Sequence, residues 1–502
     1  MEPMEVTDNQ PLTARILKGS SIVLFFTLAT APLGYFLRMI LSRTLSIEMY
    51  GLYFAMISFF SFFVTYNDLG FGYSLSYYFP KFFRKKDYKT CWNLYTYDQL
   101  IELMTSVILS VILFISAPWI ATHYFKVFEA EYLIKIFCVY FIANSIVSAL
   151  HKLYNGMQQE LYYSSMECIR FLFLVLITSI FYLSRVHDVS VYAWGLVSSY
   201  IFVAFIYRLL LQKNFNRLAN QPFSWNPKRF RTMAAYALPT IMTTSVYTLV
   251  AFSDTFFLTL LKGVKEVGIY NIMTPIITVF AIFLSPINTF LFPFISHHAD
   301  SDKNTINMLL YHTLRIIPFI SLYFAIFIIL FPNPIISILF GSKWSTSSAI
   351  ALSILAIGYS LSTLGSFLAT YIIGFGKVKE RLRVSIFMAV INSICSLCLI
   401  PFFGIIGVAI SYFISSSLSV FFQGKILASD LTIRYPIGFY IKIILFGSIL
   451  FILTRSYNLF PNNWLQLILY GIIYTAIMGV FGLWIKVYPD LWKLLQKINI
   501  PS

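Results

Sequence analysis

Long apolar runs that recur along the whole chain most constrain how this sequence can fold. Many reach about twenty residues, the length that a helix needs to cross the hydrocarbon core of a bilayer, and short polar segments separate them. Only 11% of the 502 residues are charged, against about 25% in soluble proteins, so an aqueous fold could not bury this much apolar surface. The sequence therefore predicts an all-α polytopic membrane protein with about fourteen transmembrane helices.

Polar segments and turn residues set the limits of the expected spans. Residues 384–424 are too long for one helix, and Pro401 divides them into the eleventh and twelfth spans. The other expected spans are 16–42, 50–79, 93–120, 132–154, 164–183, 189–211, 232–260, 267–296, 304–331, 345–373, 437–454 and 464–485. The expected domains are a tail (1–15), an N-lobe (16–211), a basic linker (212–231), a C-lobe (232–428) and two extra helices with a tail (429–502).

The net charge of +16 comes from Lys and Arg residues that gather between the apolar runs. No soluble domain carries a basic surface, so we expect no nucleic acid partner. The basic residues concentrate in the segments that follow the second, sixth and tenth spans, where the positive-inside rule places the cytoplasm. This pattern predicts a multi-pass protein of the cell inner (cytoplasmic) membrane with both termini cytoplasmic.

A short motif occurs twice and suggests an internal repeat. Tyr50–Tyr53 (YGLY) opens the second span, and Val267–Tyr270 (VGIY) opens the eighth, about 215 residues later. Each copy precedes a Phe-rich run and then a proline, Pro80 or Pro293. Two parallel six-helix lobes around a central cavity would follow, an arrangement suited to alternating access. The alternative is a chance match between short sequences that are common in membranes.

Several of these segments resemble the polysaccharide flippases of the O-antigen (Wzx) type. The resemblance rests on Ser42–Tyr53 (SRTLSIEMYGLY), on Asp68–Gly72 (DLGFG) followed by Pro80, and on Asp254 with Val267–Tyr270 as the second-lobe counterpart. It extends over nearly the whole chain, from about residue 16 to residue 485. That family belongs to the multidrug, oligosaccharidyl-lipid and polysaccharide exporter superfamily.

The resemblance implies a flippase that moves a polyprenyl-diphosphate-linked oligosaccharide across the cytoplasmic membrane, as in lipopolysaccharide biosynthesis. It also implies coupling to H+ or Na+, no other cofactor, and two extra helices that can form a groove for the polyprenyl tail. The implied partners are the lipid-linked oligosaccharide, membrane lipids, a polysaccharide polymerase and chain-length proteins.

Arginines within the spans are candidates for binding an anionic head group. Charged residues at membrane depth are costly, and the forked guanidinium suits phosphate oxygens. We therefore expect Arg38, Arg170 and Arg315 to contact the substrate head group. The alternative for each is a side chain that reaches back to the membrane interface.

Carboxylates within the spans are candidates for ion coupling or gating. Asp68 lies in the second span, where it would bind an ion or proton, or cap a break beside Gly70. Asp98 and Glu102 lie one helical turn apart on the third span, either as coupling groups or as a polar stripe. Asp254 occupies a position equivalent to that of Arg38 in the other lobe, so we expect these two to face each other at an outer gate.

Other functions remain open at this stage. An ion-coupled exporter of drugs or small molecules would share the fold, and a membrane polysaccharide polymerase or glycosyltransferase belongs to a different class. The external loops are short and hold no acidic pair, so we predict a protein that is not an enzyme and has no catalytic residue. The Cys395–Cys398 pair lies in an apolar helix, and we expect no metal site.

Overall fold

The computed structural model describes residues 12–299 and 303–487, and every regular element in these ranges is a helix. Close contacts divide the chain into two compact units, Met1–Gly268 and Ile269–Ser502. Helix α10 therefore packs within the first unit. The expected lobes, 16–211 and 232–428, follow the repeat in the sequence and stay a prediction.

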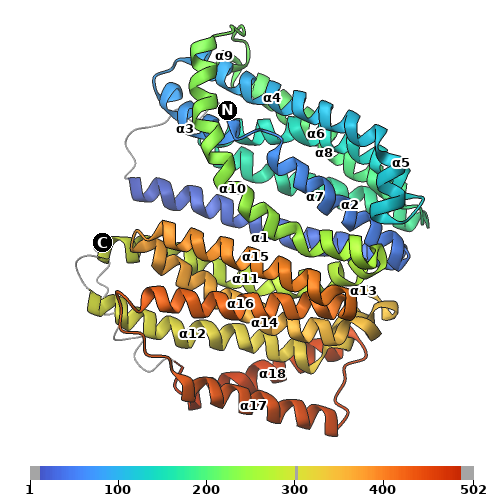
Figure 1. The fold of residues 1–502 in the computed structure, drawn as a ribbon, viewed down its shortest axis with the longest axis vertical. Coiled ribbons are helices and arrows are strands. Elements are labelled where there is room, and N and C mark those ends of the chain that lie inside the picture. The colour runs from blue at the N-terminus through green and yellow to red at the C-terminus, as the bar shows by residue number, and fades with distance from the viewer. Residues whose placement is uncertain (1–11, 300–302, 488–502) are drawn as a thin grey trace. The chain divides into compact units, whose positions relative to one another are not determined.

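Helix α6 is the centre of the first unit, because it packs against α2, α3, α4, α7 and α8. Figure 1 shows α4, α6 and α8 running alongside one another. The elements are α1 (Leu12–Thr44), α2 (Ile47–Tyr66), α3 (Phe71–Arg84), α4 (Tyr88–Ile115), α5 (Ala117–Ile120), a π-helix (Ala121–Phe125), α6 (Ala130–Gly156), α7 (Glu160–Leu183), α8 (Val189–Asn214), α9 (Asn216–Ala219) and α10 (Pro227–Lys262), followed by α11 (Val264–His298), which continues into the second unit.

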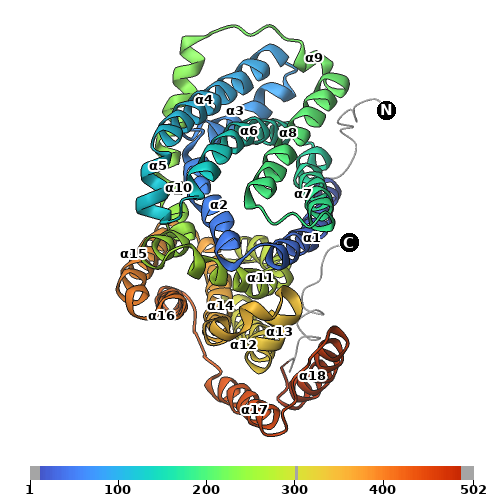
Figure 2. The same cartoon turned by 90° about the vertical axis from the view of Figure 1, so that its right-hand side faces the viewer.

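Helices α12, α14 and α16 form the core of the second unit, and α15 covers α16. Helices α17 and α18 lie side by side at the edge of this unit (Figures 1 and 2), joined by the stacked rings of Phe446 and Phe481 at 3.9 Å. The elements are α12 (Lys303–Leu330), α13 (Pro332–Phe340), a 3-10 helix (Ser342–Trp344), α14 (Ser345–Gly374), α15 (Val378–Phe403), α16 (Ile405–Leu427), α17 (Ile437–Ser456) and α18 (Trp464–Trp484).

The helices confirm the expected fold class of a polytopic all-α membrane protein. Among the described residues, thirteen helices are long and apolar enough to cross a membrane. They match all the expected spans except the seventh, 232–260, which lies within α10. The side chains of residues 242–252, in the middle of that expected span, are outside the described residues. Many large apolar side chains on these helices are exposed, such as Ile115 at 73% and Leu465 at 76%, as lipid-facing surfaces require.

One expected span is wrong in its continuity. The sequence predicts a single helix over residues 50–79, but α2 ends at Tyr66 and α3 begins at Phe71. The expected break near Pro401 is present: α15 ends at Phe403, and Gly404, with a φ of 55°, precedes α16. The first break is a local turn, in which the Asp68 carboxylate accepts hydrogen bonds from the backbone N–H groups of Gly70 and Gly72.

The repeated glycines lie against each other within the first unit. A Cβ atom on Gly51 would come within 1.9 Å of the carbonyl oxygen of Val264, and one on Gly268 within 2.6 Å of that of Ile47. No other residue fits at either position unless the backbone moves. The start of α11 thus packs directly on the backbone of α2.

Candidate functional site

The turn between α2 and α3 holds Asp68 in a fixed orientation. Its carboxylate accepts hydrogen bonds from the backbone N–H of Gly70 at 2.8 Å and of Gly72 at 3.2 Å. Gly70 has a φ of 83°, and a Cβ atom there would lie 2.4 Å from the carbonyl oxygen of Ala237. The DLGFG segment therefore forms a carboxylate-capped turn that only glycine permits at its third position.

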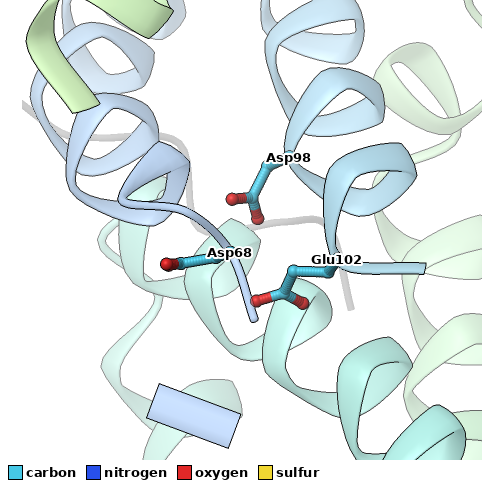
Figure 3. A group of neighbouring side chains, drawn as sticks. All are labelled: Asp68, Asp98 and Glu102. Carbon is cyan, nitrogen blue, oxygen red and sulfur yellow. The ribbon is translucent and has the colours of Figure 1, made fainter. Parts of the chain in front are cut away.

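Helix α4 supplies two further carboxylates to the same place. Asp98 and Glu102 lie one turn apart on one face of the helix and are 0% and 2% exposed. Carboxylate oxygens of Asp68, Asp98 and Glu102 all lie within 4.8 Å of one another. Figure 3 shows the three side chains converging from the α2–α3 turn and from α4.

Lys152, near the end of α6, joins these three carboxylates. Its Nζ atom is 2.8 Å from Asp68 Oδ2 and 3.3 Å from Asp98 Oδ1, and it also donates a hydrogen bond to Glu102 Oε1. A Cβ atom on Gly72 would lie 2.7 Å from the Lys152 side chain, so this glycine leaves room for the lysine stem. We call Asp68, Asp98, Glu102 and Lys152 the charge cluster.

The charge cluster is incompletely neutralised. Three ionised carboxylates against one ammonium would leave two excess negative charges in a largely buried site. Glu102 Oε1 also accepts a hydrogen bond from Ser148 at 3.0 Å, but Glu102 Oε2 is buried and has no hydrogen-bond partner among the described residues. Because an uncompensated charge at such a site is costly, the cluster is suited to taking up protons or a small cation.

Sequence reasoning identified the three carboxylates but missed Lys152. The lysine lies four residues before the end of α6, where a sequence pattern cannot distinguish it from a lysine that reaches the membrane interface. The coupling and gating roles predicted for Asp68, Asp98 and Glu102 stay predictions, and the structure adds the geometry in which they would act. Asp68 also caps the helix break, as its structural alternative required.

Arg170 is buried within the first unit. Its guanidinium pairs with Glu167 at 2.6 Å and lies over the rings of Phe171 and Tyr200, at 4.3 and 4.6 Å from their centroids. Arg38 on α1 is half-buried, with its guanidinium 4.4 Å from the ring centroid of Phe54. These contacts leave the head-group role of either arginine a prediction.

Arg315 caps the end of α18 within the second unit. Its guanidinium donates hydrogen bonds to the carbonyl oxygens of Ile485 at 3.3 Å and Lys486 at 2.8 Å, and to the Tyr311 hydroxyl at 2.9 Å. A cation at the end of a helix stabilises the carbonyl groups that have no partner there. This position gives Arg315 a structural role, and its head-group role stays a prediction.

Asp254 is buried on α10, with 8% of its surface exposed. Contacts divide the chain so that Asp254 and Arg38 both belong to the first unit. Their pairing at an outer gate stays a prediction.

The amino-acid sequence matches two protein families and resembles known membrane proteins. The profile of a family described as "Polysaccharide biosynthesis protein" matches residues 16–298, and a second profile, described as MatE, matches residues 239–398. The chain is 26% identical to an uncharacterized membrane protein, MJ1068, of Methanocaldococcus jannaschii over 96% of this chain and 98% of that protein. It is 24% identical to the capsular polysaccharide biosynthesis protein CapF of Staphylococcus aureus over 56% of this chain and 75% of CapF.

Solved structures share the fold at low sequence identity. The inward closed conformation of the lipid II flippase MurJ aligns with a TM-score of 0.72 and 17% identity, over 91% of this chain and 98% of that one. The inward-facing conformation of a multidrug resistance MATE family transporter of the MOP superfamily aligns with a TM-score of 0.59 and 16% identity, over 81% and 95%.

Proposed function

Because the chain belongs to the polysaccharide biosynthesis protein family, we propose that it is a flippase for a polyprenyl-diphosphate-linked oligosaccharide used in surface polysaccharide biosynthesis. The family match over residues 16–298 is the observation that carries this proposal. The similarity to CapF, a capsular polysaccharide biosynthesis protein, supports a role in polysaccharide biosynthesis. The fold shared with the lipid II flippase supports a lipid-linked substrate. The protein acts in the cytoplasmic membrane by alternating access and catalyses no chemical step.

The charge cluster is the coupling site in this proposal. The Lys152 ammonium contacts all three carboxylates, so a resident metal ion would have to displace it. Protons can neutralise the excess negative charge without displacing the lysine, which favours H+ over Na+. Glu102 Oε2, for which the described part of the chain supplies no hydrogen-bond partner, is the atom at which a proton is taken up in this proposal.

Translocation in proteoliposomes tests the proposal. The purified protein is reconstituted with a fluorescent undecaprenyl-diphosphate-linked oligosaccharide, and an added glycosidase reports the fraction of sugar on the outer leaflet. We expect that fraction to rise beyond one half when a pH gradient is imposed, and Glu102→Gln to abolish the response to the gradient. Vesicles without protein and the Glu131→Gln variant, altered at a partly exposed carboxylate of α6 that pairs with Lys135, are the controls.

An exporter of drugs or small molecules is the second candidate. The MatE match over residues 239–398 and the fold shared with a multidrug transporter favour it. Loading the same vesicles with ethidium separates the two candidates. Gradient-driven ethidium movement without movement of the lipid-linked saccharide would overturn the flippase in favour of the exporter.

A further inference from the structure

A cationic pocket lies between α3 and the first turns of α10, within the first unit. Its volume is about 510 Å³, within the range of roughly 300–1,000 Å³ typical of small-molecule sites. The residues that line it are Tyr78 of α3 and Lys228, Arg231, Thr232, Ala235 and Tyr236 of α10. The α10 residues recur at intervals of three or four, so they share one face of the helix, and none of the six is acidic.

Contacts between α3 and α10 give the pocket a defined shape. The backbone at Gly70 touches α10 at Ala237, where a Cβ atom would come within 2.4 Å of the carbonyl oxygen. The rings of Tyr77 and Tyr236 stack at 4.9 Å with an interplanar angle of 13°. Because α3 and α10 are held together at both places, the pocket walls are preorganised.

The start of α10 is anchored on α4 by hydrogen bonds. Asn93 and Ser224 exchange two hydrogen bonds of 2.9 Å, and the backbone N–H of Asn226 donates to the Tyr97 hydroxyl at 2.7 Å. Arg229 points to α4, where its guanidinium donates to the Thr90 hydroxyl at 2.5 Å. Of the three cations Lys228, Arg229 and Arg231, Arg229 therefore serves to hold the helix in place.

The other two cations, Lys228 and Arg231, are available to a ligand. Neither side chain forms an ion pair within the part of the chain that the structure describes, and both are exposed at the pocket. Lys81 is not a lining residue; its Nζ atom lies 3.4 Å from the ring centroid of Tyr77, the neighbour of the lining residue Tyr78. Lys228 and Arg231 thus place two positive charges at one open pocket.

The chemistry of this pocket matches a diphosphate. A guanidinium can bind two phosphate oxygens at once, the ammonium adds a point charge, and the first turn of a long helix adds a partial positive charge. The hydroxyl groups of Tyr78 and Tyr236 are further donors, whereas the Thr232 hydroxyl donates to the Lys228 carbonyl oxygen at 2.9 Å and can only accept. A volume of about 510 Å³ holds more than a single phosphate.

We propose that this pocket binds the diphosphate of a polyprenyl-linked saccharide and loads the substrate before translocation. The inference rests on the proposed function and adds a binding site to it, distinct from the charge cluster. Free diphosphate carries the same chemical group as the lipid-linked substrate. An anionic phospholipid carries only a single phosphate.

Native mass spectrometry of the detergent-solubilised full chain tests the site with three probes: undecaprenyl diphosphate, sodium diphosphate and phosphatidylglycerol. The test variant is Lys228→Gln/Arg231→Gln. The matched control is Lys213→Gln/Arg217→Gln, which removes two exposed cations from the same linker region outside the pocket. We expect the test variant to bind undecaprenyl diphosphate at least about tenfold more weakly, and the control to stay within about twofold of wild type.

Several outcomes would overturn the inference. Equal losses in both double variants would indicate general attraction between charges, and no loss in the test variant would remove the pocket from binding. Equal weakening of phosphatidylglycerol would assign the pocket to bulk lipid, and competition by sodium diphosphate at equal concentration would assign it to a free ligand. Melting temperatures within about 2 °C of wild type establish that both variants fold.

The proteoliposome assay separates this inference from the proposed function. If wild type translocates the saccharide and the pocket variant binds and translocates it normally, the loading site alone is wrong. If wild type binds undecaprenyl diphosphate through Lys228 and Arg231 but translocates no saccharide, the flippase function alone is wrong.

Discussion

Replacement of Lys152 by Met should destabilise the protein in a way that depends on pH. The substitution keeps the length of the side chain but leaves three carboxylates whose oxygens lie within 4.8 Å of one another. At an effective dielectric constant of about 20, two charges at that distance repel by roughly 3.5 kcal/mol. A carboxyl group with an ordinary pKa near 4 can instead take up a proton at pH 7, at a cost of about 4 kcal/mol.

Three carboxylates form three such pairs, and one proton relieves two of them, so protonation is the less costly response. We therefore expect Lys152→Met to lose at least about 4 kcal/mol at pH 7. The folded variant then holds about one proton more than wild type, a proton that its unfolded chain releases at this pH. Its stability therefore falls as pH rises, and the loss relative to wild type shrinks by about 1.4 kcal/mol for each pH unit below 7.

Thermal unfolding of the detergent-solubilised variants from pH 5 to pH 8 measures this effect. Lys135→Met on the same helix is the matched control: its pair with Glu131 is about one-third exposed, so we expect a change below about 0.5 kcal/mol. Adding Glu102→Gln to Lys152→Met should restore part of the lost stability, because it removes one repelling charge. A loss that is the same at pH 5 and pH 8, or no rescue by the second substitution, would refute the electrostatic account.

Three further predictions concern single contacts. Gly51→Ala should lower the melting temperature, because its Cβ atom would meet the Val264 carbonyl oxygen at 1.9 Å. Gly479→Ala should be neutral or slightly stabilising, because no described residue comes within 4 Å of the new Cβ atom; equal effects would contradict the close approach of the helices. Arg315→Gln should loosen the end of α18, seen as faster hydrogen exchange of residues 481–485, whereas Arg455→Gln at the end of α17 should leave that segment unchanged. Asp87 caps α4, and its hydrogen bond from the Thr90 hydroxyl, with Arg229 nearby, lowers the pKa of Asp87, so Asp87→Ala should cost about 1 kcal/mol at pH 7. Since that stabilisation requires the ionised carboxylate, the difference in melting temperature from wild type should disappear as pH falls below about 4, and a constant difference would contradict it.

The arrangement of spans could be predicted because it depends on local sequence. Lipid requires each crossing segment to satisfy its own backbone hydrogen bonds, so an apolar run of sufficient length becomes a helix. The break after Pro401 was predictable for a similar reason, since proline and glycine both disfavour a helix; α15 ends at Phe403, between Pro401 and Gly404. The three carboxylates could be identified because charge within an apolar run is conspicuous.

Only the tertiary structure decided which groups these charges contact. Lys152 joins Asp68, Asp98 and Glu102 because α6 packs against both α3 and α4, and no spacing in the sequence reports that packing. Arg315 lies within an apolar run, yet its guanidinium caps a helix that ends about 170 residues later in the chain. Local composition determines that a segment crosses the membrane, whereas the partner of each buried charge depends on which helices become neighbours.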